Sequence, residues 1–198
     1  MTLLILGLIL FLGGHAFTMA REPRAALVAR IGEGPYKGLY SLVSLAGIVL
    51  IAVGFGRYRA AGYIPVWDPP VFTRHLALLL VWAAFVMFVS AYLPGRIKRT
   101  LKHPMLAGVK VWALAHLIAN GDLGSILLFG SILAWAVMAR ISAKRRDEVR
   151  DHAGPAAAPA GVRNDLIAVA VGTVVWLAFL LRLHVWLIGV PVLPGAGA

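Results

Sequence analysis

Two histidines lie within long apolar stretches of the sequence, and they are the residues best placed to do chemistry. His15 stands near the end of the first apolar segment, and His116 shares the segment KHPMLAGVKVWALAHLIANGD, residues 102–122, with Lys110. Ionisable side chains are costly in hydrocarbon and therefore usually mark a functional site. Two histidines in one helical bundle predict a buried haem b as the most specific hypothesis, and packing roles for both are the plainer alternative.

The composition indicates what kind of protein must position these histidines. The 198 residues are 61% hydrophobic and 14% charged, with a mean hydropathy of +0.86, which is typical of a membrane protein. Cysteine is absent, so disulfides and thiolate ligands are excluded. The net charge of +11 comes mainly from Lys and Arg in short connections between apolar segments, so we interpret it as a topology signal and not as a nucleic-acid-binding surface.

Apolar segments cover residues 2–20, 37–56, 73–93, 104–119, 122–140 and 165–189. They predict an all-α, polytopic transmembrane helical bundle with about six membrane-spanning helices. Residues 120–122 join the fourth and fifth segments in a tight hairpin, and Pro104 suits the first turn of the fourth. The odd-numbered connections carry most of the basic residues, which places both termini on the outer, periplasmic side. We expect one domain over residues 1–198, with a flexible cytoplasmic linker at about 143–163.

Counting along the helices places the two histidines at comparable depths. His15 lies roughly 20 Å from Thr2, and His116 lies about 18 Å from Pro104. Because the two helices start at opposite faces of a core ~30 Å thick, the depths differ by about 8 Å, much of which tilt can absorb. His15 and His116 are therefore the predicted axial ligands of one iron, with His184 as the reserve ligand.

Small and aromatic residues around the histidines suit a flat cofactor. Gly14 leaves a bare helix surface beside His15, and Gly108, Trp112 and His116 recur at four-residue spacing on one helix face. This stripe offers a gap, an aromatic wall and a ligand. A Gly/Trp packing seam, with the histidine bonded to a neighbouring carbonyl, is the alternative interpretation.

Further charged residues lie toward the two ends of the bundle. His103 and Lys110 are seven positions apart and could together hold a haem propionate, a phosphate or a lipid headgroup, whereas Lys110 could instead extend to the inner interface. At the outer end, an Arg182–Asp122 pair would neutralise two charges without any functional role. His152 falls in the expected linker.

The order of three segments gives the chain a family resemblance. GGHAF at residues 13–17, KRTLKHPMLAGVKVWALAHLIANGD at 98–122 and GSILLFGSILAWAVMAR at 124–140 resemble the NnrU family of bacterial membrane proteins. That family is associated with nitrite and nitric oxide metabolism and is related to plant and cyanobacterial zeta-carotene isomerase. The resemblance implies a haem b between His15 and His116, a His-Pro pair at His103 and Pro104, and a location in the bacterial inner membrane.

The same resemblance suggests partners and a possible activity. Membrane lipid, a small apolar ligand or nitric oxide, and an electron-transfer partner are the expected partners. If the protein is an enzyme, a haem-dependent isomerase is preferred. Ala113 replaces a cysteine proposed as an alternative haem ligand in the isomerase, so a thiolate ligand switch is not available to this chain.

Two other classes of function remain open. The segment KHPMLAG, residues 102–108, is similar to the Arg-His-Pro-x-Tyr-x-Gly motif of integral-membrane methyltransferases that bind S-adenosylmethionine, although the tyrosine is missing. Asp147 and Glu148 loosely resemble the acidic motif of those enzymes. A cofactor-free sensor or assembly factor would require no substrate chemistry.

Overall fold

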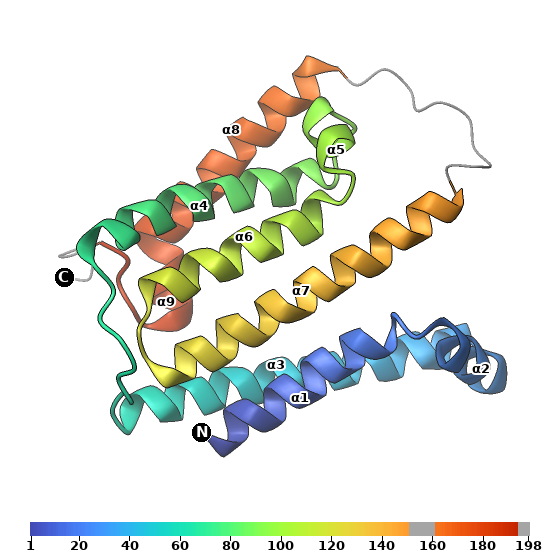
Figure 1. Ribbon diagram of the computed structural model, residues 1–198, viewed down its shortest axis with the longest axis horizontal. Coiled ribbons are helices and arrows are strands. Elements are labelled where there is room, and N and C mark those ends of the chain that lie inside the picture. Colours follow the sequence, from blue (N-terminus) through green and yellow to red (C-terminus); the bar gives the residue numbers. More distant parts are fainter. Residues whose placement is uncertain (151–160, 194–198) are drawn as a thin grey trace.

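The computed structural model describes residues 1–150 and 161–193, and this part of the chain is helical apart from its connections (Figure 1). One isolated β-bridge, Pro65 to Asp122, is the extent of its β-structure. The all-α prediction is confirmed. The helical elements are α1 (Thr2–Phe17), α2 (Arg21–Ile31), α3 (Glu33–Ala60), α4 (Val71–Ser90), α5 (Arg96–Leu101), α6 (Pro104–Ala119), α7 (Leu123–Arg150), α8 (Val162–Ala178), the π-helical η1 (Phe179–Leu183) and α9 (His184–Ile188).

Four helical stretches of the described chain are long and apolar enough to cross a membrane: α3, α4, α7 over Leu123–Asp147, and the continuous Val162–Ile188. A fifth is possible if α1 and α2, which are bent by 89° at their junction, form one span. The structure thus gives four to five candidate spans by length and composition, fewer than the six expected. The difference arises because α6 has 16 residues, about 24 Å at the α-helical rise, which is shorter than a ~30 Å core.

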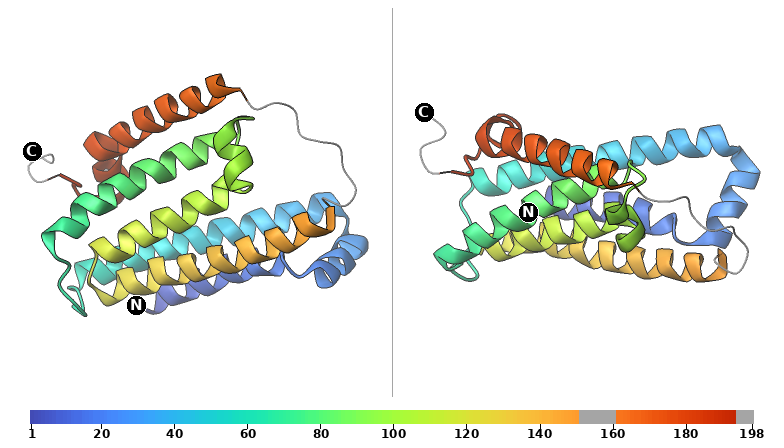
Figure 2. Two further views of the ribbon diagram at one scale, coloured as in Figure 1. Left: turned by 45° about the horizontal axis from the view of Figure 1, so that its top comes forward. Right: turned by 90° about the horizontal axis from the view of Figure 1, so that it is seen from above.

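The helices form two layers that meet along α7 (Figures 1 and 2). α1 packs on α3 in one layer, and α4 packs on α6 and α8 in the other. α7 lies against α6 and also contacts α1. The buried core cluster of Leu4, Leu8, Leu128 and Phe129 occupies this α1–α7 contact, so α7 is what joins the layers.

Glycines let α1 and α3 approach closely. A Cβ at Gly7 would lie 2.6 Å from the backbone nitrogen of Ile51, and a Cβ at Gly54 would overlap the backbone of Leu4. Membrane helices use small residues in this way because lipid provides no hydrophobic drive for helices to associate, and close van der Waals packing must provide it instead.

The connections at one end of the bundle hold each other through backbone hydrogen bonds. The amides of Val66 and Trp67 donate to the carbonyl of Gly121 at 2.8 and 3.1 Å, and the Leu123 amide donates to Ile64 at 2.9 Å. The α3–α4 connection therefore rests on the α6–α7 hairpin. A Cβ at Gly121 would overlap the Trp67 carbonyl, which explains the glycine in the turn.

Side chains organise the opposite end, where the basic connections lie. The Asp165 carboxylate accepts hydrogen bonds at 3.0 Å from the amides of Arg96 and Ile97, so it caps α5 from the start of α8. Asn164 adds a 2.8 Å bond to the Pro94 carbonyl. These contacts pin α5 and α8 together.

Several boundaries differ from those expected. The first basic connection contains a separate helix, α2, and α7 continues to Arg150, into the stretch predicted to be a flexible linker over 143–163. Pro104 does begin α6, with His103 as its N-cap, as its position at a first helical turn predicted. His152 and the middle of the expected linker lie outside the described residues.

The glycine contacts predict a sharp difference between two substitutions on one helix. Gly54→Ala should destabilise the protein by about 1–3 kcal/mol because the new methyl group would push α1 off α3. Gly56→Ala is the matched control, since a Cβ there meets no atom within 4 Å. Thermal unfolding in mild detergent measures both, and equal unfolding temperatures for the two variants would contradict this packing.

Candidate functional site

His116 lies one turn before the end of α6 and is enclosed by aromatic rings. Its Nδ1 is 2.9 Å from the Trp112 carbonyl oxygen, and its ring stacks on Phe129 of α7 at 4.6 Å between centroids, with 30° between the planes. The Trp112 ring lies 4.8 Å from the imidazole and also packs on Phe129, so the two aromatic rings are neighbours on one side of His116. If Nδ1 carries the proton and donates to the carbonyl, Nε2 keeps a free lone pair, the arrangement that metal-ligating histidines adopt.

His15 has a similar backbone bond in different surroundings. Its Nδ1 is 2.8 Å from the Phe11 carbonyl oxygen, and its ring lies 5.4 Å from both Tyr40 of α3 and Trp135 of α7. The indole Nε1 of Trp135 and the hydroxyl of Ser44 are buried without a hydrogen-bond partner in the described chain. Buried polar atoms without partners are costly, so this side of the bundle suits hydrogen bonding better than the aromatic surroundings of His116 do.

The structure does not bring His15 and His116 together. Their rings contact α7 at Trp135 and Phe129, which are six residues apart and therefore about 9 Å apart along the axis and about 120° apart around it. Leu8 packs with Phe129 in the core cluster at the level of His116. The separation of about 9 Å along α7 is close to the depth difference of about 8 Å estimated from the sequence for His15 and His116, so the tilt of the helices does not bring the two histidines to one level. Clamping one iron between these two imidazoles would require α1 to shift along α7.

His184, the reserve ligand, begins α9, which lies at the same end of the bundle as the last turn of α6 (Figure 1). His184 follows the π-helical η1 directly, and its Nδ1 lies 2.7 Å from the Val190 carbonyl oxygen. π-Helical turns are often found at functional sites because they shift the register of the residues that follow. His116 and His184 thus lie at the same end of the bundle, where the α6–α7 hairpin also lies.

The small residues of the expected haem surface pack against protein. A Cβ at Gly108 would lie 2.6 Å from the Phe88 ring, so this glycine accommodates α4, and a Cβ at Gly14 would make ordinary contact with Val43 of α3 at 3.5 Å. Trp112 does form a wall beside His116, together with Phe129 at 5.3 Å. The stripe on α6 is therefore divided between two neighbours, with Gly108 facing α4 and Trp112 facing α7.

His103 and Lys110 do not form a joint site. His103 Nε2 lies 2.7 Å from the Asp147 carboxylate of α7, and both side chains are about one quarter exposed, at 25% and 28%. Arg140 donates to the Leu101 carbonyl at 3.1 Å, and its Nη1 is buried without a partner in the described chain. Lys110 is partly exposed two turns further along α6.

The expected Arg182–Asp122 pair is not formed among the described residues. Asp122 instead accepts a 2.9 Å hydrogen bond from the Ser125 amide and so caps the first turn of α7. Arg182 is exposed within η1. The prediction is wrong because an N-cap carboxylate is already stabilised by amides and by the helix dipole.

Sequence reasoning missed two residues and one contact that shape these sites. Phe129 and Trp135 lie in the fifth apolar segment. Because that segment is apolar throughout, its sequence does not show which aromatic residues face lipid and which face the bundle. Asp147 was identified, but its contact with His103 was not. An acidic residue at the end of a long basic helix was the available signal for that contact.

The chain matches the family described as "NnrU protein" over residues 3–192. No curated protein and no solved structure is similar enough to this chain to count as a match. The matched range includes every element of the fold and all the histidines discussed above. The chain therefore belongs to the NnrU family.

Proposed function

We propose that this NnrU-family protein binds haem b through His116, as part of the nitrite and nitric oxide metabolism with which the family is associated. The observation that carries the proposal is the His116 imidazole, which has Nδ1 fixed on the Trp112 carbonyl and Nε2 free beside aromatic walls. Neutral imidazole bonded to a metal is much less costly to bury than an unpaired polar group.

His184 is the proposed second ligand, in place of His15. Its Nδ1 also lies 2.7 Å from a backbone carbonyl oxygen, and its place at the same end of the bundle as His116 favours it over His15, which contacts α7 at a different level. The donor set fits haem iron in chemistry, since both ligands would be imidazoles. The residues around His15 do not fit an iron shared with His116, for the reasons given above.

With His116 and His184 holding its iron, haem b would supply electron transfer, redox sensing, ligand binding or isomerisation when bound. Phe129 and Trp112 would exclude water from the proximal side and hold the His116 ring at a fixed angle. Ala113 stands where the isomerase has its cysteine, and the sequence contains no cysteine, so no thiolate can substitute for an imidazole.

We further propose that the chain crosses a bacterial inner membrane six times, with α6 and α1 as short spans and both termini outside. The basic connections and the caps on α5 lie at one end of the bundle, and the N-terminus and the α6–α7 hairpin lie at the other (Figure 1). Short spans of about 24 Å are accommodated by local thinning of the bilayer at a modest cost.

Absorption spectroscopy of protein purified in mild detergent from haem-supplemented cells tests the haem site. Wild type should be coloured and low-spin, His116→Ala should lose most of its haem, and His184→Ala should keep haem but become high-spin because one axial ligand is gone. His15→Ala should keep the wild-type spectrum. His75→Ala, at the exposed start of α4, is the matched control.

Two results would overturn this assignment. Colourless wild-type protein would contradict haem binding and favour a cofactor-free assembly factor. A spin-state change in His15→Ala but not in His184→Ala would restore the pairing of His15 with His116.

A methyltransferase at the other end of the bundle is the second candidate, and one contact favours it. His103 of the KHPMLAG segment meets Asp147, so a basic and an acidic residue expected from that enzyme class lie 2.7 Å apart. The site would hold S-adenosylmethionine at the polar ends of α6 and α7, separately from His116.

Isothermal titration with S-adenosylmethionine distinguishes the two candidates. Under the haem proposal, wild type and His103→Gln should both show no binding. Saturable binding that is lost in His103→Gln and kept in His116→Ala would favour methyl transfer instead.

A further inference from the structure

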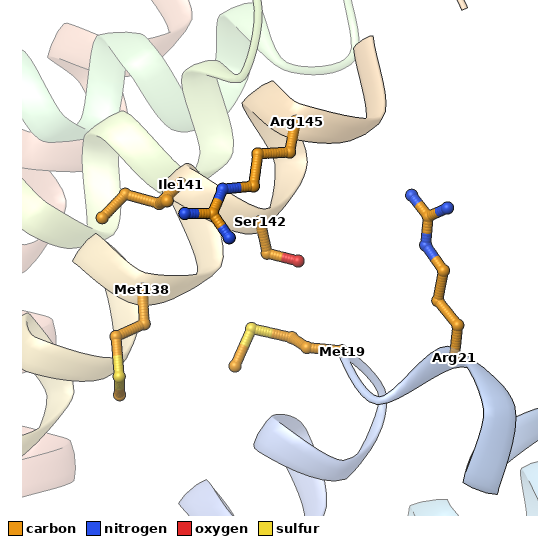
Figure 3. Close-up of a pocket in the computed structure, with 6 residues that line it drawn as sticks. All are labelled: Met19, Arg21, Met138, Ile141, Ser142 and Arg145. Atoms are coloured by element: carbon orange, nitrogen blue, oxygen red, sulfur yellow. The ribbon is translucent and has the colours of Figure 1, made fainter. Parts of the chain in front are cut away.

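A cavity of about 510 Å³ lies where α1 turns into α2 beside the last part of α7 (Figure 3). In Figure 3 the Ser142 hydroxyl points toward the Met19–Arg21 segment, and the two arginines lie at opposite sides of the opening. The cavity is lined by Met19, Arg21, Met138, Ile141, Ser142 and Arg145.

The lining changes from apolar to basic along α7. Met138 and Ile141 are 53% and 49% exposed on the outside of the bundle, and Ser142 and Arg145 follow within the next turn. An α-helix that starts at Leu123 needs about 20 residues to cross the hydrocarbon, so α7 emerges from it near Ser142. The methionine and isoleucine thus lie at acyl-chain level, and Arg145 lies at headgroup level.

The basic half of the cavity has no balancing negative charge among the described side chains. Within that part of the chain no carboxylate lines the cavity, and neither Arg21 nor Arg145 has a hydrogen-bond or ion-pair partner. Arg146 donates to the Ser142 hydroxyl oxygen at 3.0 Å, which leaves the Ser142 proton free to be donated elsewhere. The cavity therefore offers two free guanidinium groups and one hydroxyl donor.

The 89° bend between α1 and α2 places Arg21 at the membrane surface, at the level of the lipid headgroups. Because α1 runs with the bundle axis, α2 lies across it, as interfacial helices do at the membrane surface. Arg21 is the first residue of α2 and faces α7 across the opening.

We propose that this cavity binds one anionic glycerophospholipid, with its phosphate between Arg21 and Arg145 and an acyl chain along Met138 and Ile141. A phosphodiester has oxygens that a guanidinium group on either side of the opening can bind, and a basic recess beside a membrane helix is a recognised form of lipid site. A soluble phosphate would use the arginines alone and would leave the apolar half of the cavity without a partner. This inference does not depend on haem binding by His116.

Native mass spectrometry of the full chain tests the proposal with three probes: dioleoyl phosphatidylglycerol, dioleoyl phosphatidylcholine and inorganic phosphate. Wild type should retain phosphatidylglycerol in preference to the other two. The double variant Arg21→Gln/Arg145→Gln should bind phosphatidylglycerol about 30-fold more weakly, from roughly fivefold per arginine.

Arg57→Gln/Arg74→Gln is the matched control, because it removes the same charge from exposed positions at the other end of the bundle. It should bind as wild type does. Equal retention of phosphatidylcholine would overturn the proposal, as would equal weakening in both double variants. Displacement of phosphatidylglycerol by inorganic phosphate at comparable concentration would show a site for a soluble anion and would also overturn it.

Discussion

The packing of α1 against α7 is the contact on which the arrangement of the bundle depends. Leu4 and Leu8 from α1 meet Leu128 and Phe129 from α7 in the buried core cluster, and this contact joins the α1–α3 layer to the α4–α6–α8 layer. In lipid, such a contact must derive its stability from close packing, since neighbouring acyl chains are as apolar as leucine. It therefore fixes the rotation and height of α7 relative to both layers.

That fixed rotation decides what each histidine can do. α7 presents Phe129 to His116 and, about 120° further around the helix, Trp135 to His15. One helix thus separates two aromatic environments: one near the α6–α7 hairpin, and one around His15 that also contains the unpartnered polar atoms of Ser44 and Trp135. His184 lies at the same end of the bundle as His116, so the first of these environments is the better candidate for a metal ligand set.

The sequence predicted most of the helices and several of their ends. Hydropathy identified the apolar segments, and Pro104 and the turn at residues 120–122 marked the start and end of α6, because local backbone chemistry dictates those features. Hydropathy could not give the rotation of a helix that is apolar on every side, so the His15–His116 pairing rested on depth alone. The bend before α2, the π-helical turn before His184 and the His103–Asp147 contact depend on tertiary packing and are not visible in a linear pattern.

Pairwise cross-linking tests the central claim, that α7 separates His15 from His116, together with the proposal that His184 is the second ligand beside His116. The chain has no native cysteine, so a membrane-permeant bismaleimide of short span reacts only with introduced pairs. His116→Cys/His184→Cys should be linked in high yield, as should the positive control His15→Cys/Trp135→Cys, and His15→Cys/His116→Cys should not. Linkage of the His15 and His116 positions as efficient as that of His116 and His184, read by mass spectrometry of the joined peptides, would contradict the account.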